Sequence, residues 1–90
     1  MGHAITPKQP ENSFRVTLEL GVKLPRLDSV LLEYLRHQER NAELKRISRT
    51  VFKKLFDEKR ILIKGQAAKP SSGLAAGTTY VDILGYGEDA

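Results

Sequence analysis

The spacing of apolar residues changes along the chain, and the change separates a strand from a helix. Between Phe14 and Leu20, apolar and polar residues alternate at every step, which is typical of a strand with one buried face. Between Arg26 and His37 the apolar residues recur three and four positions apart, which predicts an amphipathic helix. Pro25 stands near the first turn of this helix, where its missing N–H costs little. A strand followed by such a helix indicates a domain in which helices pack on a sheet.

A second helix is predicted after a polar connection. Asn41 and Ser48 are both suitable N-cap residues, so the start of this helix stays open, and its end is expected near Lys59. The chain then passes through a β-branched strand, a tight turn and a last strand, at Ile61–Ile63, Lys64–Gln66 and Thr79–Leu84. This order of elements predicts an α+β fold in which two helices pack on one face of a small, mainly antiparallel sheet.

The length and composition fit one small domain. The chain has 90 residues, of which 40% are hydrophobic. Residues 1–12 contain two prolines and no periodicity, and we expect them to form a disordered tail. Residues 13–84 are expected to form the domain, and residues 85–90 a linker or a cut end.

The absence of cysteine excludes a disulfide framework and a thiolate metal site. It also fits a cytoplasmic location, where thiols are kept reduced and disulfides are rare. No apolar run approaches the roughly 20 residues that a membrane-spanning helix needs. The first residues contain no apolar signal core. We therefore expect a cytoplasmic monomer that does not contact a membrane.

Positive charge is concentrated in the middle of the chain. The formal net charge is +4, from 15 Lys and Arg against 11 Asp and Glu. Between Arg36 and Lys64 there are ten Lys or Arg residues and four acidic residues. A clustered excess of this kind favours a polyanionic partner.

The stretch from Arg46 to Gly65 reads as a short basic helix that leads into a buried strand. With about 100° of rotation per residue, the apolar residues expected on its buried side are Leu44, Ile47, Val51 and Leu55. The cations that then fall within about 60° of one another on the opposite side are Arg46, Arg49, Lys53 and Arg60. Such a row suits a phosphate backbone, although the same pattern also fits an ordinary solvated helix face.

An ordered set of short motifs between residues 26 and 84 adds a family resemblance to this pattern. The motifs are Arg26-Leu27-Asp28, Ser48-Arg49, Arg60-Ile61-Leu62-Ile63-Lys64-Gly65, Lys69-Pro70, and Gly77 ahead of Tyr80-Val81-Asp82-Ile83. In order and spacing they resemble the αL-type RNA-binding domain first recognised in ribosomal small-subunit protein S-four. Lys64-Gly65 stands where that family often has Asn-Gly, and the connection between His37 and Ile47 is longer than usual.

The strand that precedes Arg26-Leu27-Asp28 is similar to the start of large-subunit-type pseudouridine synthases, in which this module precedes a separate catalytic domain. The resemblance implies a noncatalytic module that positions structured RNA, with ribosomal RNA as the expected target, for a catalytic domain absent from these 90 residues. One alternative is a free-standing RNA-binding factor that acts on ribosomal particles or tRNA. Another is a protein-interaction module whose basic face meets an acidic protein.

The basic pattern and the resemblance together give a set of candidate RNA-binding residues. They are Arg26, Arg46, Ser48, Arg49, Lys53, Arg60, Lys64 and Lys69. Arg49 is best suited to a bidentate grip on phosphate, whereas Ser48 fits both a phosphate contact and a helix cap. The chain has three Tyr and three Phe, most of them at apolar-periodic positions. We therefore expect contacts to phosphates and 2′-hydroxyls and no base-stacking platform.

No catalytic, metal-binding or cofactor-binding arrangement is predicted. Arg-Leu-Asp also occurs in the catalytic motif of these synthases, where the aspartate is the nucleophile, a histidine or glycine precedes the motif and Thr-Ser-Gly follows closely. Here Pro25 precedes the motif and Ser29 follows it, so we interpret Asp28 as structural, bound to helix-start N–H groups or to a cation. His3 and His37 are the only histidines, and neither a cysteine nor a close carboxylate pair accompanies them.

Overall fold

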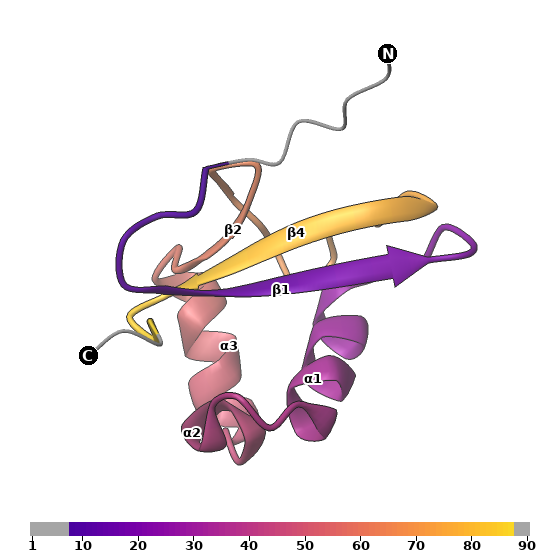
Figure 1. Cartoon of the computed structure of the whole chain (residues 1–90). Helices are drawn as coiled ribbons and strands as arrows, with labels where there is room; N and C mark the ends of the chain where they lie inside the picture. Colours follow the sequence, from indigo (N-terminus) through magenta and orange to yellow (C-terminus); the bar gives the residue numbers. More distant parts are fainter. Residues whose placement is uncertain (1–7, 88–90) are drawn as a thin grey trace.

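A computed structural model describes residues 8–87, so residues 1–7 of the predicted tail and residues 88–90 of the predicted linker lie outside the described part. The elements are β1 (Ser13–Leu20), α1 (Leu27–His37), α2 (Ala42–Lys45), α3 (Arg49–Asp57), β2 (Ile61–Ile63), β3 (Gln66–Ala67) and β4 (Gly77–Leu84). Figure 1 shows the helices on one side of the strands, with α1 and α3 next to each other. This arrangement confirms the predicted α+β fold.

The four strands form one antiparallel sheet in the order β1-β4-β2-β3. The long strands β1 and β4 pair along their whole length, from Ser13 opposite Leu84 to Leu20 opposite Gly77. Strands β2 and β3 are joined by Lys64 and Gly65, whose φ angles are 54° and 77°. Positive φ at both central residues is what a two-residue type I′ hairpin turn requires, and it explains the small residue at the second position.

The core lies between the sheet and the helices. The alternation between Phe14 and Leu20 predicts that Phe14, Val16, Leu18 and Leu20 face inward. The first three are at most 5% exposed, and Leu20 is partly buried against the core, so this prediction is confirmed. The buried residues opposite them come from the neighbouring strands and from α1, and they are Val81, Ile83, Ile61, Leu27, Leu31 and Leu35. The apolar face predicted by the alternation in β1 therefore packs against the apolar face predicted by the three- and four-residue spacing in α1.

The second helical region consists of two helices, because both candidate caps are used. The Asn41 side chain accepts a hydrogen bond from the Leu44 amide at 2.9 Å and starts α2. The Ser48 hydroxyl accepts one from the Val51 amide at 3.1 Å and starts α3. The prediction of one helix face running from Leu44 to Arg60 is therefore wrong.

The break between α2 and α3 also changes which residues of α3 face the core. Val51 was expected on the buried side, but it is 43% exposed. The buried aromatic residues are instead Phe52 and Phe56, whose rings pack edge to face with centroids 5.2 Å apart. The other three residues expected on the buried side are at most 6% exposed and are therefore confirmed: they are Leu44, Ile47 and Leu55.

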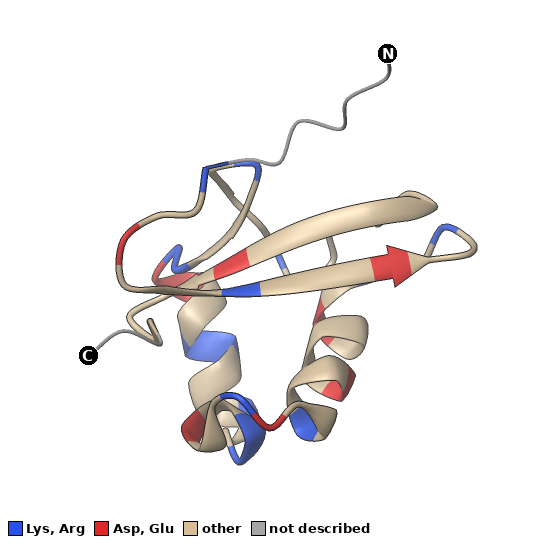
Figure 2. Ribbon diagram, viewed as in Figure 1, with Lys and Arg blue, Asp and Glu red and all other residues tan. Residues whose placement is uncertain are grey.

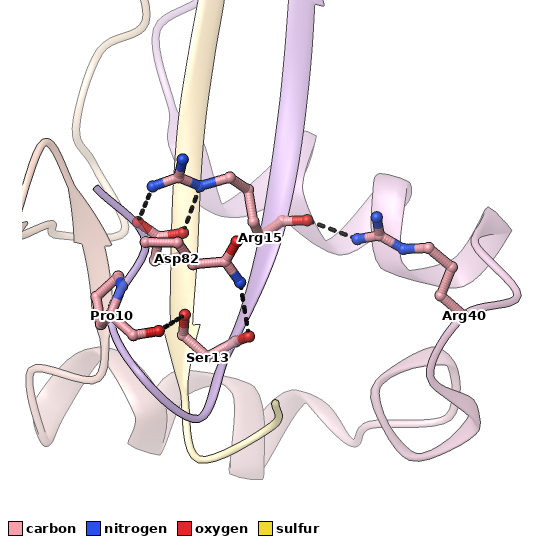
Figure 3. Close-up of polar contacts among 6 residues, drawn as sticks. Pro10, Ser13, Arg15, Arg40 and Asp82 are labelled. Carbon is pink, nitrogen blue, oxygen red and sulfur yellow. Dashed lines mark hydrogen bonds and ion pairs between the residues drawn. The ribbon is translucent and has the colours of Figure 1, made fainter. Parts of the chain in front are cut away.

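The outward face of the sheet carries a buried ion pair between cross-strand partners. Arg15 of β1 donates from Nε and Nη2 to the two carboxylate oxygens of Asp82 of β4, both at 2.8 Å (Figure 3). The two side chains are 14% and 2% exposed. This bidentate bond raises the pKa of the Arg15 guanidinium. Arg40 binds the free edge of β1. Its guanidinium donates to the Arg15 carbonyl (Figure 3) and lies 4.3 Å from the centre of the Phe14 ring.

The residues that flank β1 and β4 bind each other. The Gly85 amide donates to the Asn12 carbonyl at 2.7 Å, and the Gly87 amide donates to the Asn12 side chain at 3.1 Å. The Ser13 hydroxyl donates to the Pro10 carbonyl (Figure 3). Within residues 8–87 there is no helix of the length and apolar character that crossing a membrane requires.

Candidate nucleic-acid interface

A groove of about 690 Å³ lies between α1 and α3. The α1 side of the groove consists of Arg26, Asp28, Ser29, Leu32, Glu33 and Arg36. The α3 side consists of Arg49, Phe52, Lys53 and Phe56, and Pro70 closes one end. The groove therefore brings together three of the predicted RNA-binding residues, from segments far apart in the sequence.

The two walls of the groove differ in charge. Both acidic residues of the groove, Asp28 and Glu33, lie on the α1 wall, where they balance Arg26 and Arg36. The α3 wall carries the cations Arg49 and Lys53 and no acid. These two residues are four positions apart, so their side chains lie on the same side of the helix. Of the residues that line the groove, the α3 wall therefore contributes positive charge alone.

Arg26 lies at the rim of the groove and is bound by Asp28. Its Nε and Nη2 donate to the two Asp28 carboxylate oxygens at 3.1 and 3.0 Å. The Asp28 carboxylate also accepts from the Ser29 amide at 2.8 Å. The hydrogen bond from Arg26 lowers the pKa of Asp28, and the same bond raises the pKa of Arg26. The two structural roles predicted for Asp28 were a bond to a helix-start N–H or a pair with a cation, and the structure shows both.

Arg36 is a groove cation that the sequence pattern did not single out. It lies in the last turn of α1, lines the groove and is half-buried. Its Nη1 donates to the Lys45 carbonyl at 2.9 Å, which ties the end of α2 to α1. A basic residue in the last turn of a helix has an ordinary role at the helix dipole, so only the tertiary contact reveals its place in the groove.

The predicted residues Arg46 and Ser48 lie beside the groove without lining it. Arg46 is the exposed C-cap of α2, and Ser48 is the N-cap of α3. Lys64 and Lys69 are exposed in the β2–β3 turn and in the loop that follows β3. Lys69 immediately precedes the groove residue Pro70. Of these four residues, Arg46 and Ser48 flank the start of α3 and Lys69 adjoins the groove, whereas Lys64 lies in the hairpin turn between β2 and β3.

Arg60 is placed elsewhere. It follows α3, and its Nη2 donates to the Leu84 carbonyl at 3.1 Å while its guanidinium lies 5.8 Å from the centre of the Tyr86 ring. A Cβ on Gly85 would come within 1.9 Å of the Arg60 Nη2 atom. The structure therefore assigns Arg60 a packing position at the end of β4, away from the groove that holds Arg49 and Lys53.

Most basic residues in the described part form no ion pair. Only four of the fifteen Lys and Arg residues pair with an acid, whereas five of the nine described Asp and Glu residues are paired. Eleven cations then face four acids with no ion pair in residues 8–87. Figure 2 shows basic residues on α3 and near α2, and further basic residues in loops away from the helices. An excess of cations without ion pairs favours attraction to polyanions over a range set by the ionic strength.

Comparison with protein-family models, with curated proteins and with solved structures finds no match for the chain. Among residues 8–87 there is also no group of three or more His, Cys, Asp or Glu side chains that could hold a metal ion.

Proposed function

We propose that this chain is a noncatalytic RNA-binding module whose α1–α3 groove receives the phosphate backbone of structured RNA. The observation that carries the proposal is the α3 wall of the groove, where Arg49 and Lys53 lie on one side of the helix with no acid on that wall. A guanidinium binds phosphate through two parallel hydrogen bonds, and an ammonium adds a compact positive charge.

The groove suits recognition of RNA shape. Its aromatic residues Phe52 and Phe56 are each only 5% exposed, so their rings offer no face on which a base could stack. Structured RNA is recognised largely through phosphates, 2′-hydroxyls and the shape of the helix. A groove with four cations and buried aromatic rings fits this mode of recognition.

The resemblance to the αL-type domain supports ribosomal RNA as the target and a pseudouridine synthase as the enzyme that this module serves. In that role the module supplies affinity and placement, and a separate domain isomerises the uridine. Arg26, Arg49 and Lys53 are the motif residues that also line the groove, so they are the residues on which the resemblance and the geometry agree.

The proposal is tested by the affinity of the chain for a ribosomal RNA hairpin, measured by fluorescence anisotropy. Each phosphate contact steepens the salt dependence, so three or four contacts predict a loss of about 100-fold between about 50 and about 300 mM salt. The double variant Arg49→Glu/Lys53→Glu is expected to weaken binding by about 100-fold at low salt, because it reverses the charge of the α3 wall.

The matched control is Lys8→Glu/Lys23→Glu, which makes the same change in net charge at two exposed residues outside the groove. We expect this control to weaken binding by less than about 5-fold, since only long-range attraction is reduced. Equal losses in the two double variants, or an affinity independent of salt, would contradict a phosphate-binding groove.

A further inference from the structure

We propose that Asp28 is a positioning residue for RNA binding: its carboxylate holds the Arg26 guanidinium at the rim of the groove so that the remaining donors face an RNA phosphate. This inference rests on the proposed function and names a part of the same site. According to this inference, the acidic residue Asp28 strengthens the binding of a polyanion.

The geometry of the pair leaves donors available. A guanidinium has five N–H donors, and Arg26 uses one from Nε and one from Nη2 to bind the two Asp28 oxygens. The Arg26 side chain is still 54% exposed, whereas that of Asp28 is 29% exposed. Three donors are therefore left on an oriented guanidinium, and a phosphate can bind them without first ordering a flexible side chain.

Asp28 also connects the two sides of this end of the groove. Its backbone N–H donates to the Pro70 carbonyl at 3.1 Å, and Pro70 closes the groove next to Arg26. Its carboxylate accepts from the Ser29 amide, which fixes the carboxylate relative to the start of α1. The rim therefore consists of one hydrogen-bonded unit that includes Arg26, Asp28 and the loop at Pro70.

The inference predicts an effect opposite in sign to simple charge repulsion. Removal of a negative charge from a phosphate-binding groove strengthens binding if the charge acts only through space. Removal of Asp28 weakens binding if the carboxylate positions Arg26. Glu33 is the matched control, because it lines the same wall of the groove but is paired with His37.

The experiment measures the affinity for the RNA hairpin in Asp28→Asn and Glu33→Gln, each in the wild-type and in the Arg26→Ala background. Asparagine matches the shape of aspartate, but its NH₂ group cannot accept the second bond from Arg26. We expect Asp28→Asn to weaken binding about 5-fold and Glu33→Gln to strengthen it about 2-fold. In the Arg26→Ala background the loss from Asp28→Asn should disappear.

Three further measurements separate the loss of the bidentate bond from a loss of folding. Arg26→Lys keeps the charge but cannot form the bidentate bond, so it should weaken binding as much as Asp28→Asn. In the free protein, the Arg26 Nε–H resonance should be protected from exchange with water, and this protection should be lost in Asp28→Asn. Circular dichroism establishes that each variant is folded before its affinity is compared.

The inference is overturned if Asp28→Asn strengthens binding as Glu33→Gln does, or if it weakens binding equally with and without Arg26. The Arg49→Glu/Lys53→Glu variant separates this failure from failure of the proposed function. If that variant binds RNA like the wild type, the groove is not the RNA site and both proposals fall. If it loses affinity while Asp28→Asn does not, only the positioning role is wrong.

Discussion

Two bidentate arginine–aspartate pairs, one on the outward face of the sheet and one at the rim of the helical groove, use the same chemistry in different surroundings. Arg15 and Asp82 join neighbouring strands and are 14% and 2% exposed. Arg26 and Asp28 are two residues apart at the start of a helix and are 54% and 29% exposed. Both pairs form the same two hydrogen bonds, but the Arg26–Asp28 pair is more exposed to water than the Arg15–Asp82 pair.

This difference in exposure indicates what each pair can do. In the buried pair the charges are removed from water, so each needs the other and neither can turn toward a ligand without a large cost. In the exposed pair the guanidinium keeps solvated donors and contributes little to stability. The outward face of the sheet therefore stabilises the fold, and the rim of the groove is available for binding.

The largest expected effect comes from breaking the buried pair. Asp82→Asn should lower the free energy of unfolding by about 2–3 kcal/mol, because asparagine removes the charge that faces a guanidinium held out of water. Urea denaturation followed by circular dichroism measures this change. RNA affinity should be unchanged, since neither residue of the pair lines the groove.

The double replacement Arg15→Met/Asp82→Leu serves as the control for this prediction. Apolar residues of similar size often replace a buried ion pair with no net loss of stability, so the double variant should be more stable than Asp82→Asn alone. A loss of less than about 0.5 kcal/mol in Asp82→Asn would show that the pair on the sheet is as weak as an exposed pair.

A smaller effect is expected at the start of α3, which holds the α3 wall of the groove. Ser48→Ala should cost about 1 kcal/mol, because the Val51 amide loses its acceptor. Thr50→Ala is the matched control, since it also removes a hydroxyl from an exposed residue of the same region. Alanine is the better helix former, so Thr50→Ala should not destabilise. Equal destabilisation by both changes would contradict the assignment of Ser48 as the cap.

The smallest expected effect on stability comes from the exposed pair, and it depends on pH. The pKa of Asp28 in the folded protein lies below its ordinary value of 3.8 because of Arg26. A lowered pKa means that the stabilisation is fully present above pH 3.8 and is lost as the pH falls through the folded-state pKa. The difference in stability between wild type and Asp28→Asn should be constant between about pH 5 and pH 8. It should disappear under more acidic conditions, and a difference that grows on acidification would contradict this assignment.

Those parts of the fold could be predicted in which a short sequence pattern has one physical cause. The alternation in β1 follows from one buried face, and Lys64-Gly65 follows from the positive φ angles of a two-residue hairpin. Strand β3 was not predicted, because two residues are too few to show a periodicity. The pairing of Arg15 with Asp82 was not predicted either, since it depends on the register of strands that are far apart in the sequence.

The residues of the candidate site could be predicted only in part, because the bounds of α2 and α3 determine which side chains line the groove. The sequence contains both caps, Asn41 and Ser48, but their joint use depends on tertiary contacts such as the bond from Arg36 to the Lys45 carbonyl. A single continuous helix would have put Arg60 in line with Lys53. Helix α3 instead ends at Asp57, which leaves Arg60 outside the helix and bound at the end of β4.

The most direct test of the account is a map of RNA contacts on the folded chain, made by titrating the ¹⁵N-labelled protein with the ribosomal RNA hairpin at low salt. We predict the largest changes in NMR chemical shift in the groove, at Arg36, Arg49 and Lys53. Resonances of Thr17 and Tyr80, beside the ion pair on the outward face of the sheet, should not move. Changes concentrated at Thr17 and Tyr80 with an unperturbed groove would contradict the assignment of the α1–α3 groove as the RNA site.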